Sequence, residues 1–178
     1  MEKARVKRYM KIFAKLFVML ALFGWFIESS SLGVVNGTIS AILISLASVS
    51  ISAIILIPFD YSRTKQLPIE ALNVRQKHYI QVKGNVEDIF IKVQDILKNL
   101  KNIKKINASR EKLIISARTK LTFETCGEKI ILKFDTSLKD FVGVYIESCP
   151  VVRFTLMDYG YNFKNVEYLA KEILKQYN

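Results

Sequence analysis

The stretch from Ser29 to Phe59 contains no charged residue, whereas the chain from Asp60 onward has the mixed charge of a globular domain. Within it, Thr38 to Phe59 would form an uninterrupted helix of about 33 Å, which matches a hydrocarbon core of roughly 30 Å. Pro58 and Asp60 close this segment. The pattern predicts a membrane-spanning helix over about residues 38–59.

A first apolar segment precedes it and is interrupted by Glu28. The Leu, Ile, Val and Phe residues between Leu16 and Val35 contribute roughly −3 to −7 kcal/mol to insertion, and an acid near the helix centre costs about 3 kcal/mol. The summed free energy of insertion is favourable, which predicts that residues 13–35 also form a membrane-spanning helix. A cleaved signal peptide is the alternative, because a basic start and a short apolar run precede small residues.

The distribution of basic residues predicts the orientation. Six Lys or Arg residues precede the first apolar segment, the connector around Asn36-Gly37 has none, and Arg63 and Lys65 follow the second. Because basic loops stay in the cytoplasm, we expect a multi-pass protein of the cell membrane with both termini cytoplasmic. This places the lipid bilayer first among the expected partners.

Small residues predict where the two helices meet. They lie on one stripe of each helix, at Ala14, Ala21 and Gly24 and at Ala41, Ser45, Ser48 and Ser52. Small faces let helix backbones approach closely in lipid, within one chain or in a homo-oligomer. A reversal at Asn36-Gly37 would place Glu28 near Ser45. Glu28 is then either a proton or ion site, or a carboxyl group that makes an interhelical hydrogen bond or reaches water.

Residues 60–77 predict a linker, and residues 78–178 predict a cytoplasmic α+β domain. Asn85 is a good helix N-cap, and apolar residues from Val86 to Leu100 recur at helical spacing. A second helical stripe runs from Val166 to Tyr177. Alternating segments predict strands at 78–83, 103–108, 113–119, 122–125, 129–135, 141–148 and 151–156. The order β-α-β(5–6)-α predicts an antiparallel sheet with both helices on one face, as a two-layer sandwich or a curved sheet gripping the terminal helix.

Three short motifs carry a resemblance. Gly127-Glu128-Lys129-Ile130, the run from Asp158 to Asn162, and Asn165-Val166-Glu167 resemble an uncharacterised group of small bacterial membrane-anchored proteins. The resemblance covers roughly the last 100 residues. It implies a bacterial origin and a shared fold, and it implies no activity.

The loop with Asp158, Tyr159, Gly160 and Asn162 is the most enzyme-like stretch. An acid, a phenol and an amide would meet at a strand-to-helix junction, where a backbone nest could hold an anion. In the structural interpretation, Gly160 supplies a positive φ and Asn162 caps the helix. No second acid, nucleophile or base is placed by the sequence to complete a catalytic set.

A basic stretch is the second candidate site. Residues 98–120 contain eight basic residues and a single acidic residue, Glu111, whereas the rest of the chain from Asp60 onward has equal numbers of basic and acidic residues. The eight basic residues are Lys98, Lys101, Lys104, Lys105, Arg110, Lys112, Arg118 and Lys120. Such a concentration favours anionic lipid headgroups or an acidic protein partner, or it is simply a solvated surface. The aromatic and glycine pattern of a nucleic-acid stacking surface is missing, which disfavours nucleic acid.

The histidine and cysteine content bears on whether the chain can bind a metal ion or cofactor. The chain has one histidine, and its two cysteines lack metal-ligand spacing, so we expect no metal and no cofactor. The leading hypothesis is a non-catalytic, membrane-anchored binding or regulatory module that recognises a protein partner or the anionic membrane surface. The alternative is a small-ligand binder or enzyme with a cavity between the curved sheet and the terminal helix. A third hypothesis is a hairpin that oligomerises and perturbs the membrane.

Overall fold

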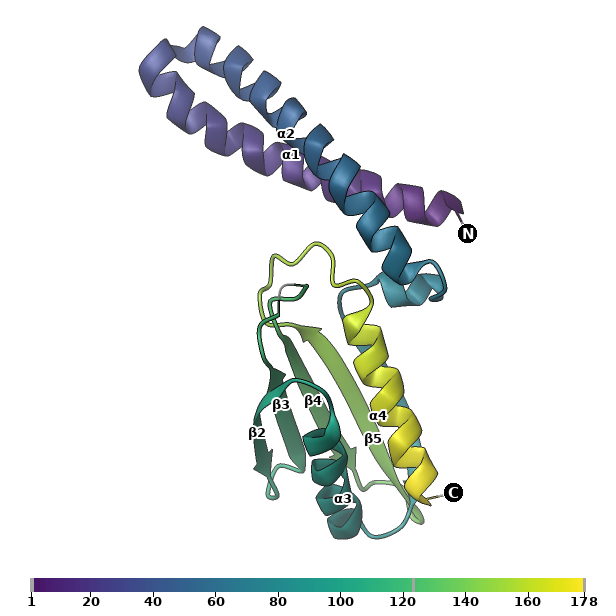
Figure 1. The fold of residues 1–178 in the computed structure, drawn as a ribbon. Helices are drawn as coiled ribbons and strands as arrows, with labels where there is room; N and C mark the ends of the chain where they lie inside the picture. The colour runs from purple at the N-terminus through teal and green to yellow at the C-terminus, as the bar shows by residue number, and fades with distance from the viewer. Residues whose placement is uncertain (1, 123, 178) are drawn as a thin grey trace. The chain divides into compact units, whose positions relative to one another are not determined.

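The computed structural model describes residues 2–122 and 124–177 and divides the chain into two compact units (Figure 1). The first unit, Met1–Ile69, is a helical hairpin, and the second, Glu70–Asn178, is an α+β sandwich. Each unit is built around its own internal contacts.

The hairpin consists of α1 (Glu2–Leu32) and α2 (Val34–Thr64). Both helices are long and apolar enough to cross a membrane, a property of length and composition that core helices and signal sequences can share. The chain reverses at Gly33, which has a φ of 78° that glycine adopts without steric cost. The predicted reversal at Asn36-Gly37 is therefore wrong, because these residues already lie in the first turns of α2.

Gly37 instead allows the two helices to approach closely. A Cβ atom at this position would lie 2.7 Å from the Cα atom of Ser29, and one at Gly24 would touch the side chain of Ala41 at 3.4 Å. The predicted contact between small faces is confirmed at Gly24 and Ala41. It is wrong at Ala14, which is exposed, because Ala14 lies about 200° around α1 from the buried Ile12.

A 3₁₀ turn, η1 (Ile69–Leu72), starts at the last residue of the first unit and continues into the second. The described residues of the second unit then form five strands and two helices in the order β1 (Gln76–Lys83), α3 (Val86–Asn99), β2 (Ile103–Ser109), β3 (Ile114–Thr119), β4 (Glu128–Asp135), β5 (Phe141–Pro150) and α4 (Tyr161–Tyr177). Every strand pair is antiparallel, and the spatial order is β1-β5-β4-β3-β2. The predicted α+β class is confirmed.

Two of the predicted strands are wrong. Described residues 122, 124 and 125 form a loop, and Phe123 lies outside the described residues. The segment 151–156 is also irregular, and Phe154 is 87% exposed. The reason for the irregular segment 151–156 is that β5 has no free edge. Strands β4 and β1 already pair with its two sides, and these pairings end at Pro150 and Ser148. The segment after β5 therefore cannot fold back on β5 as the second strand of a hairpin.

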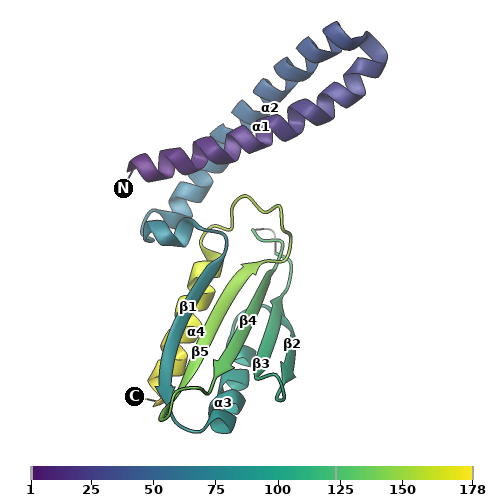
Figure 2. The same ribbon diagram turned by 180° about the vertical axis from the view of Figure 1, so that it is seen from behind.

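The core lies between the sheet and its two helices. The Asn85 side chain accepts a hydrogen bond from the backbone N–H of Glu87 at 2.7 Å, which starts α3 as predicted. Phe90 and Leu97 of α3 and Leu169 and Ile173 of α4 are almost fully buried against alternate residues of the strands, including Ile115, Ile130, Leu132, Val144 and Ile146. Figure 2 shows the other side of the sheet, which neither helix covers and which we call the open face.

Candidate functional site

All eight residues of the predicted basic stretch are exposed. Lys98 lies on α3 and pairs with Asp95 at 2.8 Å, and Lys101 follows that helix. Lys104 and Lys105 lie on the edge strand β2, at an irregularity in its register with β3. The remaining four are Arg110 and Lys112 in the β2–β3 turn, Arg118 on β3, and Lys120 just after it.

The strand register brings part of this stretch together and separates the rest. Lys105 lies directly across from Arg118, and Arg118 lies directly across from Lys129 on β4. These three exposed cations on three neighbouring strands of the open face are called the basic row. Arg110 and Lys112 lie at the other end of the β2–β3 hairpin and do not join it.

The basic row borders a hollow of about 330 Å³, which Asn107 and Ser116 also line. Within the described part of the chain, none of the three cations forms an ion pair. Like charges directly across a strand pair destabilise a sheet. Three cations abreast, beside an amide and a hydroxyl that donate hydrogen bonds, are therefore suited to hold an anion, whose charge would offset the repulsion.

Lys129 was missed from the sequence. It stands nine residues beyond Lys120, outside the run of basic residues, and only the β3–β4 register places it beside Arg118. Its alternation with the buried Ile130 did predict that it faces away from the core. The neighbour on the next strand could not be predicted without the pairing.

A second hollow on the open face contains two tyrosines. Tyr79 and Tyr145 lie on paired strands with ring centroids 4.4 Å apart, and both are more than one third exposed. The Tyr79 ring lies over Gly143, where a Cβ atom would be 2.9 Å from the ring. The hollow measures about 420 Å³ and is also lined by Lys77, Lys133 and Glu147. An aromatic pair with polar rims is typical of a protein contact surface.

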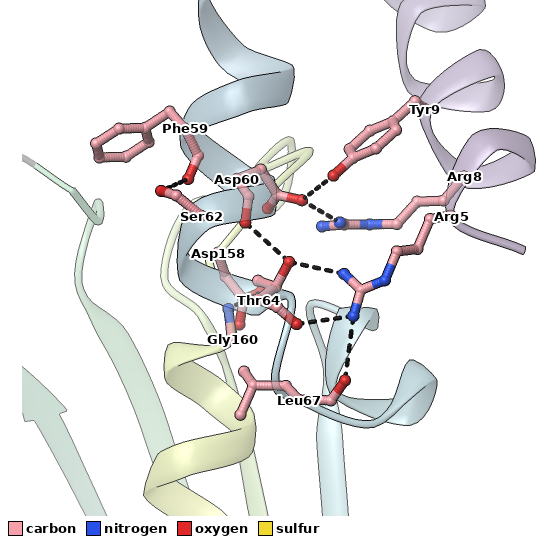
Figure 3. Close-up of polar contacts among 10 residues, drawn as sticks. All are labelled: Arg5, Arg8, Tyr9, Phe59, Asp60, Ser62, Thr64, Leu67, Asp158 and Gly160. Carbon is pink, nitrogen blue, oxygen red and sulfur yellow. Dashed lines mark hydrogen bonds and ion pairs between the residues drawn. The ribbon is translucent and has the colours of Figure 1, made fainter. Parts of the chain in front are cut away.

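The enzyme-like loop forms a buried helix cap. The carboxylate of Asp158 accepts hydrogen bonds from the backbone N–H of Gly160 at 3.3 Å (Figure 3) and from the backbone and side chain of Asn162 at 3.0 and 2.8 Å. Tyr159 and Gly160 both have positive φ. The structural interpretation of Gly160 is confirmed, but Asp158 rather than Asn162 caps α4. The Asn162 side chain instead accepts from Ser148 Oγ at 2.6 Å.

Glu28 and Ser45 do not meet. Residues 28 and 29 lie across from Gly37, and the Ser45 hydroxyl donates to the carbonyl of Ala41 at 2.6 Å. Ser45 is eight residues from Gly37, which is about 12 Å along the helix. The predicted neighbourhood is wrong because the chain reverses at Gly33, which shifts the register of α2 against α1.

A polar cluster at the chain ends of the hairpin was not predicted (Figure 3). Asp60 accepts from Arg8 at 2.7 Å and from the hydroxyl of Tyr9 at 2.8 Å. Arg5 donates to the Thr64 hydroxyl at 2.9 Å and to its carbonyl at 2.7 Å. Asp60 and Thr64 are fully buried, and these bonds satisfy Asp60 Oδ2 and the Thr64 hydroxyl, whereas Asp60 Oδ1 has no partner among the described residues. The cluster ties the N-terminus of α1 to the C-terminus of α2.

Neither a family model nor a curated protein matches the chain. One similar solved structure is described as the crystal structure of a conserved protein from Geobacillus kaustophilus. It is 12% identical, covers 58% of this chain and 97% of the other, and has a TM-score of 0.27. A likeness at this level assigns no function.

Proposed function

We propose that this chain is a non-catalytic binding module held at the cell membrane, whose C-terminal unit docks on anionic lipid headgroups through the basic row. The observation that carries the proposal is the alignment of Lys105, Arg118 and Lys129 on the open face without an acidic partner among the described residues. Lys101, Lys104 and Lys120 lie at the same end of β2 and β3 and extend the surface.

The hairpin supports the membrane location. Large apolar side chains are exposed along both of its helices, among them Phe26 at 75%, Val35 at 72% and Ile54 at 74%. An apolar surface of this extent is unfavourable in water and is covered in a bilayer. The basic flanks favour the topology in which both termini are cytoplasmic and Gly33 lies at the outer surface.

The binding energy of the basic row is small, so anchoring of the chain by the hairpin is important. A basic residue near an anionic bilayer contributes about 1 kcal/mol, so the basic row alone gives roughly 3 kcal/mol. Affinity of about 1 mM requires roughly 4 kcal/mol, so the row by itself would bind only weakly. A hairpin in the same bilayer raises the effective concentration of headgroups and makes such a weak contact sufficient.

A protein partner is the second candidate. The exposed pair of Tyr79 and Tyr145 in its own hollow supports this alternative, since tyrosines are enriched where proteins meet. The cavity between sheet and helices that a ligand binder would need has less support. That space is occupied by side chains that are almost fully buried, including Phe90, Leu132 and Ile173.

The test uses a fragment of residues 70–178, which contains all residues of the core. After circular dichroism confirms that it folds, its binding is measured to vesicles of phosphatidylglycerol with phosphatidylcholine and to vesicles of phosphatidylcholine alone. We expect binding to the acidic vesicles only, weakening as salt rises to about 0.15 M and screening shortens to about 8 Å.

The matched variants separate the basic row from net charge. Replacing Lys105, Arg118 and Lys129 together with glutamine should weaken acidic-vesicle binding about 100-fold, because roughly 3 kcal/mol is lost. A control with glutamine at Lys139, Lys171 and Lys175, three exposed lysines outside the surface, removes the same charge. Equal losses in both triple variants, or no preference for acidic vesicles at low salt, would contradict the proposal.

A further inference from the structure

Two loops at one end of the C-terminal unit expose large apolar side chains. Leu121, in the loop between β3 and β4, is 74% exposed. Phe154, in the loop between β5 and α4, is 87% exposed, and Val151 and Val152 are exposed beside it. These four residues are together called the apolar tip. Clustered apolar exposure of this kind marks a contact surface.

Backbone contacts hold the two loops together. The backbone N–H of Val151 donates to the carbonyl of Gly127 at 3.0 Å, which joins the second loop to the end of the first. A Cβ atom on Gly127 would lie 3.2 Å from the carbonyl of Thr119, the last residue of β3. Figure 1 shows both loops at the same end of the sheet. The apolar side chains of the two loops therefore belong to one surface.

A tight turn presents the phenylalanine. The backbone N–H and the hydroxyl of Thr155 both donate to the carbonyl of Val152, at 3.2 and 2.8 Å. The two residues inside this turn are Arg153 and Phe154. Because the turn is already ordered by hydrogen bonds, binding through it costs less conformational entropy.

The charges around the apolar tip suit an anionic membrane surface. Lys120 and Arg153 are exposed next to its apolar residues. The acidic residue of the two loops, Glu124, is half-buried and accepts a hydrogen bond from the hydroxyl of Tyr161. Cations beside apolar groups match a bilayer, in which anionic headgroups cover hydrocarbon. A symmetric contact with a second copy of the chain would instead bring the same cations together.

The basic row lies at the same end of the sheet. Arg118 is the last residue but one of β3, and Lys129 is the second residue of β4, so each is close to the first loop. The first residue of β1, Gln76, pairs with Ser148 near the end of β5. The chain that leaves the hairpin therefore enters the C-terminal unit at the end that carries the apolar tip.

We propose that the apolar tip inserts into the bilayer below the headgroups, with Phe154 and Leu121 at the hydrocarbon boundary and Lys120 and Arg153 at the lipid phosphates. This inference rests on the proposed docking through the basic row and adds the apolar half of that contact. Membrane binding at an interface depends on both the apolar area buried and the attraction to anionic lipid.

The test uses the full-length chain with Trp25→Phe and Phe154→Trp. Trp25 is the single native tryptophan, so all tryptophan emission then reports position 154. The emission should shift to the blue in nanodiscs of phosphatidylglycerol with phosphatidylcholine, relative to nanodiscs of phosphatidylcholine alone. Lipids brominated on their acyl chains should quench it. The control is Phe141→Trp in the same background, because Phe141 is exposed at the opposite end of β5, and it should show neither change.

A second measurement gives the contribution of the apolar side chain to docking. Phe154→Ser should lower the ratio of docked to free C-terminal units about tenfold in acidic nanodiscs, because transfer of a Phe side chain out of water is worth at least about that factor. The ratio is measured by the slowing of amide hydrogen exchange in residues 103–109. Leu121→Ser should act in the same direction, and Phe141→Ser should have no effect.

The outcomes separate insertion from docking. Slowed exchange in residues 103–109 of the acidic samples, with unshifted and unquenched emission from a tryptophan at position 154, would overturn insertion and leave docking through the basic row intact. Absence of both signals would overturn both. A blue shift that acyl bromine does not quench would identify a second copy of the chain as the partner, and it would also overturn insertion.

Discussion

Replacing Arg118 with glutamine should stabilise the C-terminal unit, although Arg118 is the central residue of the proposed binding surface. It lies directly between Lys105 and Lys129 across two strand pairs. Removing its charge eliminates two like-charge contacts and leaves a polar side chain of moderate length in place. A gain in stability combined with a loss of binding is typical of a residue retained for function.

The magnitude follows from the register. Cβ atoms of directly opposite residues lie about 5 Å apart, and long side chains let their charged ends separate to about 7 Å. Two unit charges at about 7 Å in water repel by about 0.6 kcal/mol. Two such pairs give about 1.2 kcal/mol, which screening at about 0.15 M salt reduces to roughly 0.5 kcal/mol. For a unit of this size, that gain raises the midpoint of thermal unfolding by about 2–4 °C.

Urea unfolding of the fragment 70–178 measures the effect. The control is Arg110→Gln, which removes the same charge in the β2–β3 turn, away from the basic row. Arg118→Gln should raise the free energy of unfolding more than Arg110→Gln, and the difference should vanish at about 1 M salt, where screening acts over about 3 Å. Destabilisation by Arg118→Gln at low salt, or a gain independent of salt, would refute the electrostatic reasoning.

Three further predictions concern the hairpin and the core. In a background without the native cysteines, a cysteine at Asn36 should react with an impermeant thiol reagent on intact cells and one at Ser62 should not; labelling at Ser62 alone would reverse the orientation. Gly37→Ala should lower the thermal stability of the hairpin in detergent, although alanine favours a helix by about 1 kcal/mol, because its Cβ would meet Ser29 at 2.7 Å. Phe90→Asp should leave fragment 70–178 unfolded by circular dichroism, since burying a charge adds to the 3–5 kcal/mol that loss of a buried Phe side chain costs. Native stability there would mean that the buried face of α3 is misassigned.

Local patterns predicted the helices of the C-terminal unit well. The apolar stripe of α3 and its Asn85 cap depend only on neighbours along the chain, and both are present. The segment 151–156 has the same alternation as a strand, yet β5 already has partners on both sides. Strand formation depends on an available neighbour, which no local pattern contains.

The hairpin turn shows the same limit. Asn36-Gly37 is a strong turn signal, but Gly33 makes the reversal and Gly37 serves the close contact between α1 and α2. Either glycine could have taken either role until the two helices were packed. For the candidate sites, the sequence predicted the basic stretch, whereas the position of Lys129 beside Arg118 depends on strand register.

Hydrogen exchange of the full-length chain tests the central claim most directly, in nanodiscs of acidic lipid and in nanodiscs of neutral lipid. β2 is an edge strand, so the backbone groups on its outer side have no strand to pair with and exchange readily. If the C-terminal unit docks through the basic row, amides of residues 103–109 and 118–120 should exchange more slowly in acidic nanodiscs, whereas those of α4 should not change. Equal exchange of these segments in both lipids would contradict docking on the anionic membrane surface.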